Sequence, residues 1–326
     1  MKKIENLIIE ITSKCNLKCI HCGYQNIEDA IISVEDIKSI ITKCIPLGLK
    51  MVMLSGGEPT LYNSLKEILL FCKTVSLKTK IATNGYNLSS IRHLLEENLI
   101  DQIIISIDAF NASTYTAIRG VNLLQKIWND YDELILHREK IHFSFLIQQK
   151  NYLELLPFLY KCKQKNVKSI SLLVPHLDGD FTGTIPTNSY VKSVFLSELD
   201  IDLFKKNISN SLKNFYHNNP EIFSFGPKHI QAIIQYLSAM PEQLRDQTLR
   251  TSGCSLPLKT LFIYANKSVR MCPYHNEWTF PNIDDFLKNI QQNRMKAIFT
   301  SKERNSYCRY CLEVPLDVAI IDSSNN

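Results

Sequence analysis

Three cysteines near the N-terminus have the spacing of iron–sulfur ligands. Cys15, Cys19 and Cys22 form a C-x3-C-x2-C triplet directly after the first strand-like segment of the chain. A [4Fe–4S] cluster usually has four cysteine ligands, so a cluster on this triplet would leave one iron open for a group that is not protein. A zinc knuckle uses the same residue types and is the alternative interpretation.

A glycine-rich run follows, about one strand–helix–strand unit later. Ser55-Gly56-Gly57-Glu58-Pro59 comes directly after the strand-like segment 51–54. Two adjacent glycines let the backbone approach a ligand closely, and a glutamate can orient an ammonium group. Together and in this order, the triplet and the run resemble the radical S-adenosylmethionine (SAM) superfamily.

This resemblance implies a cofactor arrangement. The triplet would hold a [4Fe–4S] cluster, the open iron would bind SAM, and Gly56, Gly57, Glu58 and Pro59 would contact it. One electron from the cluster would break a carbon–sulfur bond of SAM and give a 5′-deoxyadenosyl radical. A reductant such as flavodoxin or ferredoxin would supply that electron.

Further cofactor contacts are implied at other strand ends. Thr83 and Ser106 close the predicted third and fourth strands, and their hydroxyls suit hydrogen bonds to the ribose and amino-acid parts of SAM. His21 lies where relatives often carry an aromatic residue beside adenine. Arg119, in an Ile-Arg-Gly segment that resembles one in the family, is expected to be an exposed structural residue.

Short apolar runs alternate with amphipathic ones over the first half of the chain. Strands are predicted at 4–11, 51–54, 79–83, 102–107, 142–147 and 169–174, and helices at 34–47, 61–75, 88–99, 123–137 and 152–165. This order predicts the α/β class with a parallel sheet. The resemblance implies a partial (β/α)6 TIM-like barrel over residues 1–180, with its chemistry at the carboxyl ends of the strands.

Four more cysteines lie in the C-terminal part: Cys254, Cys272, Cys308 and Cys311. Cys272 ends a predicted hairpin with a turn at 266–268, and a helix is predicted at 283–299. The arrangement resembles the Twitch subdomain, a shortened SPASM extension, and implies an auxiliary [4Fe–4S] cluster. The hairpin lacks the usual glycine, and a four-cysteine zinc site is the alternative.

The predicted domain plan is a barrel at 1–180, a helical insertion or connector at 181–253, a Twitch-like domain at 254–315 and a tail at 316–326. The insertion is hypothesised to wall the substrate cavity, with a solvent-facing decoration as the alternative. No catalytic residue is assigned. His176, Asp178 and Asp180 are candidates for a proton-accepting base by position only.

The amino-acid composition bears on the partners and the compartment expected for the protein. The 326 residues are 45% hydrophobic and carry a net charge of +5, with no basic cluster interleaved with aromatics, so no nucleic-acid partner is expected. No apolar run spans a bilayer and no signal peptide is visible, which predicts a cytoplasmic location. In that compartment the ten cysteines are expected to be metal ligands or core thiols, with Cys44, Cys72 and Cys162 in the core.

The favoured function is a radical SAM oxidoreductase acting on a natural-product or carbohydrate-type small molecule, with the auxiliary cluster accepting an electron. A full set of four auxiliary cysteines favours electron transfer, because no iron would be open for substrate. A maturase of ribosomally made peptides or proteins stays open. A molybdenum-cofactor cyclase is disfavoured, because it would predict a C-terminal Gly-Gly tail and three auxiliary cysteines. A zinc-binding interaction module is the non-enzyme alternative.

Overall fold

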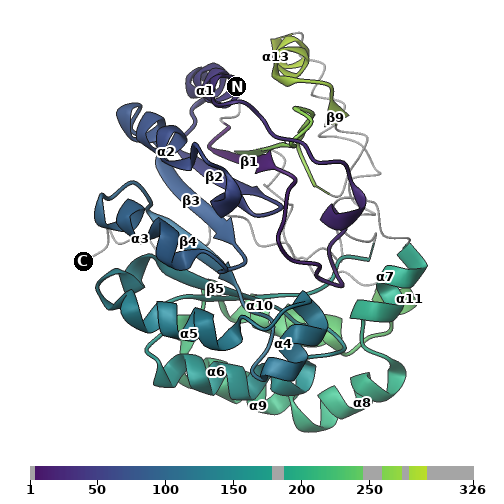
Figure 1. Cartoon of the computed structure of the whole chain (residues 1–326). Helices are drawn as coiled ribbons and strands as arrows, with labels where there is room; N and C mark the ends of the chain where they lie inside the picture. The colour runs from purple at the N-terminus through teal and green to yellow at the C-terminus, as the bar shows by residue number, and fades with distance from the viewer. Residues whose placement is uncertain (1–3, 178–186, 245–258, 274–278, 292–326) are drawn as a thin grey trace. The chain divides into compact units, whose positions relative to one another are not determined.

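The computed structural model describes residues 4–177, 187–244, 259–273 and 279–291 (Figure 1). The chain divides into two compact units. The first is formed by residues 1–16, 24–104 and 254–305, and the second by residues 17–23, 105–253 and 306–326. The domain boundaries expected from the sequence, at 180, 253 and 315, remain predictions.

The first unit is built on a mixed sheet. Three parallel strands, β1 (Asn6–Thr12), β2 (Met51–Gly56) and β3 (Lys78–Thr83), lie in the order β3-β2-β1. On the other side of β1 lies β7 (Thr260–Ile263), in parallel register with Ile8 opposite Phe262. Two short antiparallel strands, β8 (Val269–Arg270) and β9 (Thr279–Phe280), extend the sheet.

The predicted C-terminal hairpin is confirmed. Strands β7 and β8 pair antiparallel, and the turn is closed by Tyr264 N donating to Ser268 O at 2.9 Å. Its parallel pairing with β1 was not predicted, because nothing local in either segment specifies a partner more than two hundred residues away.

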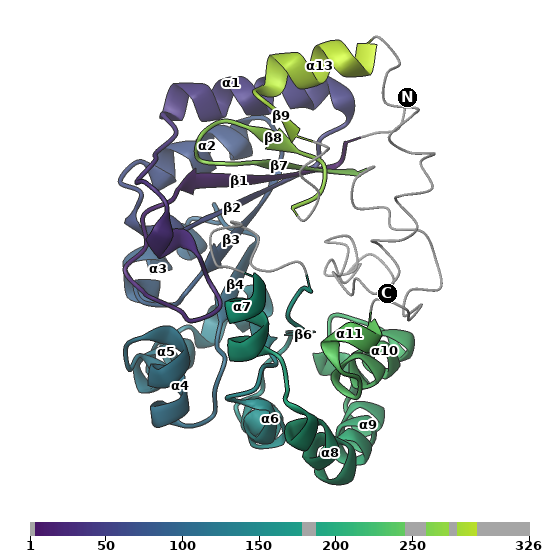
Figure 2. The same cartoon turned by 90° about the vertical axis from the view of Figure 1, so that its right-hand side faces the viewer.

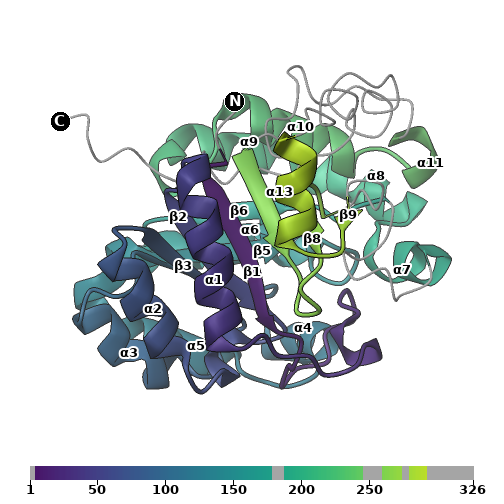
Figure 3. The ribbon, with the colours of Figure 1, turned by 90° about the horizontal axis from the view of Figure 1, so that it is seen from above.

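Amphipathic helices cover one face of this sheet: α1 (Val34–Cys44), α2 (Leu65–Thr74) and α3 (Leu88–Glu96) (Figure 1). Helix α1 begins at Ser33, whose hydroxyl accepts from Asp36 N at 3.1 Å, and it lies along β1 and β2 (Figure 3). Helix α13 (Ile283–Gln291) lies beside α1, held by an ion pair of Lys43 Nζ with Asp284 Oδ1 at 2.8 Å (Figure 2). Short 3₁₀ turns are η1 (Tyr24–Asn26), η2 (Ile45–Leu47) and η3 (Pro59–Leu61).

Strand β4 (Gln102–Ser106) begins in the first unit and ends in the second. In the second unit β5 (Ile141–Leu146) and β6 (Ile170–Leu173) pair in parallel. Between β4 and β5 lie α4 (Ala112–Arg119), α5 (Leu124–Glu133) and η4 (Ile135–Lys140), and between β5 and β6 lie η5 (Tyr152–Glu154) and α6 (Leu155–Gln164). Trp128 of α5 packs edge-on against Phe143 of β5, with ring centroids 5.2 Å apart, and both are buried.

Residues 187–244, the described part of the segment predicted as an insertion, are largely helical. The helices are α7 (Thr187–Val194), α8 (Glu198–Asn207), α9 (Ser209–Asn218), η6 (Pro220–Ile222), α10 (Pro227–Leu237) and α11 (Pro241–Leu244). Figure 2 shows α8, α9 and α10 as neighbours. The apolar pattern of the sequence predicts a single helix near 201–216, where α8 and α9 lie. At their junction Ser209 Oγ donates to Lys205 O at 2.8 Å, a bond that bends helices.

The predicted α/β class is confirmed, and the sheet is open, consistent with a partial barrel. Cys44, Cys72 and Cys162 are fully buried in the core as predicted, and burial raises the pKa of the Cys44 and Cys72 thiols to about 12. Within the described ranges, no helix has both the length and the apolarity needed to cross a membrane.

Candidate functional site

The two glycines of the Ser55–Pro59 run are required by a close approach of backbone. Gly56 has a φ of +130°, and a Cβ there would overlap the carbonyl oxygen of Thr12. A Cβ on Gly57 would lie 2.5 Å from the carbonyl carbon of Lys14 and overlap the carbonyl oxygens of Ser13 and Lys14. Gly57 N donates to Thr12 O and Glu58 N to Lys14 O, both at 2.8 Å. The run therefore fixes the backbone that leads into Cys15.

Glu58 is fully buried and its carboxylate accepts four hydrogen bonds. Oε1 accepts from Thr60 N at 3.0 Å, Thr60 Oγ1 at 2.6 Å and Thr83 Oγ1 at 2.7 Å, and Oε2 accepts from Asn84 N at 2.7 Å. The Thr83 hydroxyl also accepts from Gly85 N at 3.1 Å. Two predicted cofactor-binding side chains, Glu58 and Thr83, thus bind each other and join the ends of β2 and β3. Pro59 is buried beside them in η3.

Asn84 is a site residue that the sequence analysis did not assign. The residue is 7% exposed, and its Nδ2 atom lies 2.8 Å from Asn16 Oδ1 and 3.8 Å from Cys15 Sγ. Its Oδ1 accepts from Tyr86 N at 2.9 Å, which fixes the orientation of the amide. Asn84 therefore presents an N–H to the first cysteine of the triplet. A strand-end asparagine directly after Thr83 was the available signal.

Cys19 and Cys22 belong to the second unit, where they form one turn with Cys22 N donating to Cys19 O at 3.2 Å. Ile20 N donates to Ile118 O at 2.9 Å, so this turn lies against the C-terminal end of α4. Helix α4 ends at Arg119 and is capped by Gly120, which has a φ of +84°. A Cβ on Gly120 would lie 3.4 Å from Lys18 O.

The expectation that Arg119 is exposed was wrong. The residue is 7% exposed, its Nη1 atom donates to Cys19 Sγ at 3.7 Å, and its Nη2 atom forms an ion pair with Asp108. The reason is tertiary: the contact between the end of α4 and the cysteine turn brings the guanidinium next to a buried carboxylate. Although burial works against the charge, Asp108 and Cys19 raise the pKa of Arg119, so it stays a cation.

Asp108 is held from several sides. It is 1% exposed, and its Oδ1 accepts from Leu146 N, the last residue of β5, at 2.8 Å. Asn151 Nδ2 donates to the carbonyl oxygens of Asp108 and Leu146 at 2.9 and 2.8 Å. Ser106, the predicted SAM ligand, ends β4 two residues earlier and is half-buried. Asp108 was not predicted as a site residue, although a carboxylate just past a strand end was a usable signal.

His21 belongs to the cysteine turn itself, between Cys19 and Cys22. Its Nε2 atom is 3.9 Å from Asp108 Oδ2, and its Nδ1 atom is 3.4 Å from Gln148 Nε2. Burial lowers the pKa of His21 to about 4, against the opposing effect of Asp108, so the ring is neutral near pH 7. The pKa of the Cys19 thiol is raised by burial, and the Arg119 guanidinium opposes that rise.

The structure leaves parts of the predicted site untested. Cys15 lies in the first unit, and Cys19 and Cys22 in the second. Cys272 is half-buried after β8, whereas Cys254, Cys308, Cys311, Asp178 and Asp180 lie outside the described residues. Within the described ranges, no three Cys, His, Asp or Glu side chains are grouped to hold one metal ion. Even so, two of the triplet sulfurs receive N–H donors from buried side chains, which suits thiolate ligands of a cluster.

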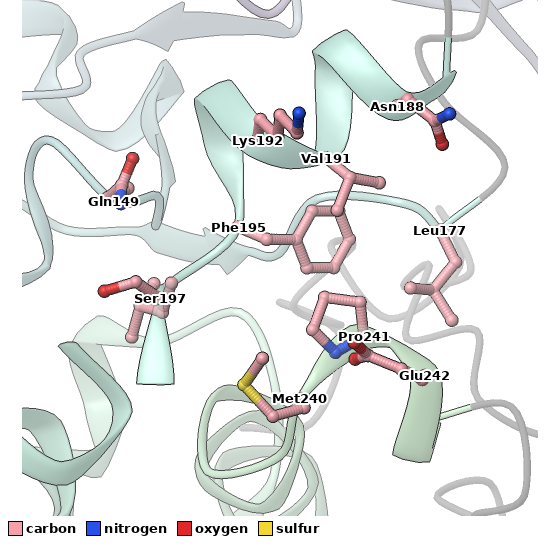
Figure 4. A pocket seen from close by; sticks show the side chains of 11 residues that line it. Gln149, Leu177, Asn188, Val191, Lys192, Phe195, Ser197, Met240, Pro241 and Glu242 are labelled. Atoms are coloured by element: carbon pink, nitrogen blue, oxygen red, sulfur yellow. The ribbon is translucent and has the colours of Figure 1, made fainter. Parts of the chain in front are cut away.

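The second unit also contains a pocket of about 440 Å³ (Figure 4). It opens between α7 and the start of α11, and Figure 4 shows the Phe195 ring between Val191 and Pro241. Gln149 and Leu177, which follow β5 and β6, also line it, so it lies on the carboxyl side of these strands. The remaining lining residues are Asn188, Lys192, Leu196, Ser197, Met240 and Glu242.

Sequence comparison finds relatives for the segment that contains the cysteine triplet and the Gly-Gly run. Residues 9–144 match the radical SAM superfamily. The GTP 3′,8-cyclase of Psychromonas ingrahamii is 36% identical over 132 residues, 39% of each chain. The probable GTP 3′,8-cyclase of Sulfolobus acidocaldarius is 27% identical over 179 residues, 54% of this chain and 57% of that protein. The matches therefore span about half or less of these relatives' lengths.

Solved structures share the fold. Streptococcus suis SuiB bound to SAM matches with a TM-score of 0.62 and 18% identity, covering 83% of this chain and 60% of SuiB. The protein anSMEcpe with bound SAM matches with a TM-score of 0.61 and 16% identity, covering 93% of this chain and 82% of that one. The segment that matches the radical SAM superfamily, residues 9–144, includes the cysteine triplet, the Gly-Gly run and the ends of β1 to β4.

Proposed function

We propose that the protein is a radical SAM enzyme in which Cys15, Cys19 and Cys22 hold a [4Fe–4S] cluster with an open iron for SAM. One observation carries the proposal. The triplet follows β1 inside the matched segment, and buried side chains, Asn84 and Arg119, aim N–H groups at two of its sulfurs. When bound and reduced, the cluster supplies the electron that cleaves SAM.

The surrounding residues position this cofactor. Gly56 and Gly57 hold the backbone before Cys15, and Glu58 and Thr83 lock the ends of β2 and β3 together. The side chains of Glu58 and Thr83 are already hydrogen-bonded to each other, so we propose that these two residues support SAM binding through the shape of the loop. Neutral His21 offers a flat ring next to the cysteine turn, and Ser106 a hydroxyl at the end of β4. Both remain proposed SAM contacts.

We assign substrate binding to the pocket of Figure 4. Its volume of about 440 Å³ falls in the range of small-molecule sites, and most of its lining is apolar. Among the described residues that line it, Lys192 is the one cation and Glu242 the one anion. This favours a weakly charged small molecule. An auxiliary [4Fe–4S] cluster, which we propose is held by the four C-terminal cysteines, would accept the second electron of a two-electron oxidation, the first leaving with the hydrogen atom that the 5′-deoxyadenosyl radical abstracts.

Two other substrate classes follow from the comparisons. The curated relatives are named GTP 3′,8-cyclases, but a triphosphate usually needs several cations, and Lys192 is the one cation on the described lining of this pocket. Peptide modification is the second candidate, because SuiB with precursor peptide SuiA matches 84% of the chain and anSMEcpe with a peptide 94%. Either substrate would require groups outside the pocket.

The test begins with iron and sulfide per chain after anaerobic reconstitution. We expect about eight irons in the parent, and about four after Cys15→Ala/Cys19→Ala/Cys22→Ala or after Cys254→Ala/Cys272→Ala. Cys72→Ala, in the core, is the control and should keep all of them. With SAM and dithionite, 5′-deoxyadenosine should form in the parent and not in the triplet variant. A colourless parent that contains zinc alone would refute the proposal and favour a zinc-binding module.

The substrate assignment is tested on the reconstituted enzyme. GTP is the available probe: its consumption with SAM and dithionite would overturn the proposed oxidation and support a cyclase. Val191→Glu would add a charge to the apolar wall of the pocket. It should leave 5′-deoxyadenosine formation without substrate intact and remove turnover once a substrate is found.

A further inference from the structure

Arg119 connects a cysteine of the triplet to a buried acid. Its guanidinium donates from Nη1 to Cys19 Sγ at 3.7 Å and from Nη2 to Asp108 Oδ2. We propose that Arg119 is a positioning residue that orients the Cys19 ligand and raises the reduction potential of the cluster, with Asp108 holding the guanidinium in place. This inference rests on the proposed function, because it requires a cluster on Cys19.

The guanidinium has little freedom to move. Arg119 is the last residue of α4, its side chain is 8% exposed, and Asp108 beside it is 1% exposed. Asp108 is itself fixed by Leu146 N at 2.8 Å and, through its carbonyl, by Asn151. A donor held this firmly keeps one geometry toward the sulfur, so its hydrogen bond requires no rearrangement when the charge of the ligand changes.

The charge of the donor determines the direction of the effect. A guanidinium is always charged in proteins, and hydrogen bonds from a charged donor are about twice as strong as those between neutral groups. Hydrogen bonds to the sulfurs and local net charge set the potentials of iron–sulfur clusters. The reduced cluster carries one more negative charge than the oxidised cluster. A cation bound to Cys19 Sγ therefore stabilises the reduced form more.

Asp108 limits this effect and makes it local. Its carboxylate neutralises the guanidinium at longer range, so the direct N–H···S contact is the main contribution. The Arg119 Nε atom is buried and makes no hydrogen bond within the described ranges. One N–H donor of the guanidinium therefore has no acceptor among the described residues, as expected for a side chain whose role includes a cofactor. A purely structural ion pair would affect stability and leave the potential unchanged.

The test is an EPR-monitored redox titration of the reconstituted full-length protein, following the signal that SAM perturbs. Removing Arg119 alone would leave Asp108 buried and uncompensated, so the main variant is Arg119→Gln/Asp108→Asn, which removes both charges. We expect the equilibrium constant for one-electron reduction to fall about tenfold, which is a shift of about 59 mV to more negative potential. Arg119→Lys should shift it the same way but less, because one ammonium replaces the two-pronged contact.

Arg138→Met is the matched control. Arg138 is a half-buried arginine of the same unit that pairs with Asp132 and stacks on Tyr131, and its substitution should leave the potential unchanged. A double variant with full iron and the potential of the parent would overturn the inference. If the double variant does not fold, an unshifted Arg119→Lys variant would overturn it. If the parent holds no cluster on the triplet, the proposed function fails instead.

Discussion

The substitution Glu58→Gln tests whether Glu58 organises the strand ends. The carboxylate is fully buried and accepts four donors, three at Oε1 and one, Asn84 N, at Oε2. A glutamine that keeps oxygen at Oε1 must place its NH2 group against Asn84 N. Two donors then face each other, and the volume of the side chain is unchanged. The change therefore isolates hydrogen bonding from packing.

The expected cost follows from these contacts. Losing one hydrogen bond to a charged acceptor costs about 1.5–3 kcal/mol. The three bonds at Oε1 also weaken, because a neutral acceptor makes bonds about half as strong. We expect a total of about 3–5 kcal/mol. At about 2 °C per kcal/mol for a large chain, the unfolding midpoint should fall by about 6–10 °C.

The measurement is the thermal midpoint of the reconstituted protein by circular dichroism at one scan rate. Glu67→Gln is the matched control: Glu67 pairs with Lys38 at 2.6 Å, but its side chain is 52% exposed. Exposed pairs contribute about 0–1 kcal/mol, so the control should fall by about 2 °C or less. If Glu58→Gln melts within 2 °C of Glu67→Gln, roughly the size of that control effect, the organising role is refuted.

Two further predictions concern Gly57 and Glu10. Gly57→Ala should lower the iron content, because its Cβ would lie 2.5 Å from the Lys14 carbonyl carbon and shift the backbone before the triplet; Gly226→Ala, with open space around the Cβ, should not. Burial raises the pKa of Glu10 from its ordinary value of 4.5 to about 7, against the charge of Arg270. The stability that the neutral Glu10 carboxyl gives to the folded state is therefore complete below pH 4.5 and is lost as pH rises to 7. Glu10→Gln should therefore remove up to about 3 kcal/mol of pH dependence between pH 4.5 and 7 in urea unfolding, and equal slopes in parent and variant would contradict this.

Local patterns predicted most of the elements. The strand–helix alternation up to β6 and the β7–β8 hairpin agree with the structure, because hydrophobic periodicity and turn residues are local features of each segment. The region 123–137 was predicted as one helix but contains α5 and the 3₁₀ segment η4. The parallel pairing of β7 with β1 was not predicted, since no short-range signal selects a distant strand.

The site was harder to predict than the fold. The residue types and spacing of the triplet and of the Gly-Gly run indicated the chemistry, but the partners of each side chain come from distant segments. Arg119 was misplaced because Cys19, one hundred positions away, and Asp108 bury it. Glu58 stays a predicted cofactor contact, but its hydrogen bonds to Thr83 and Asn84, some 25 positions on, were not predicted. Neither composition nor hydrophobic periodicity indicates which side chains from distant segments pair.

The same sequence of contacts, from a buried acid through a donor to a cysteine sulfur, occurs in both units. In the first unit, buried Glu58 binds the backbone N–H of Asn84, whose side chain contacts Cys15. In the second, buried Asp108 binds Arg119, which contacts Cys19. Each acid follows a strand end and acts on a sulfur through an intermediate donor.

A loss of activity in a Glu58 or Asp108 variant would therefore not identify a catalytic acid. An acid that acts through a donor changes iron retention or the cluster potential before it changes any chemical step. Measuring iron content and potential first, and turnover second, separates the two roles. A variant that keeps both values and still loses turnover would assign the carboxylate to the reaction itself.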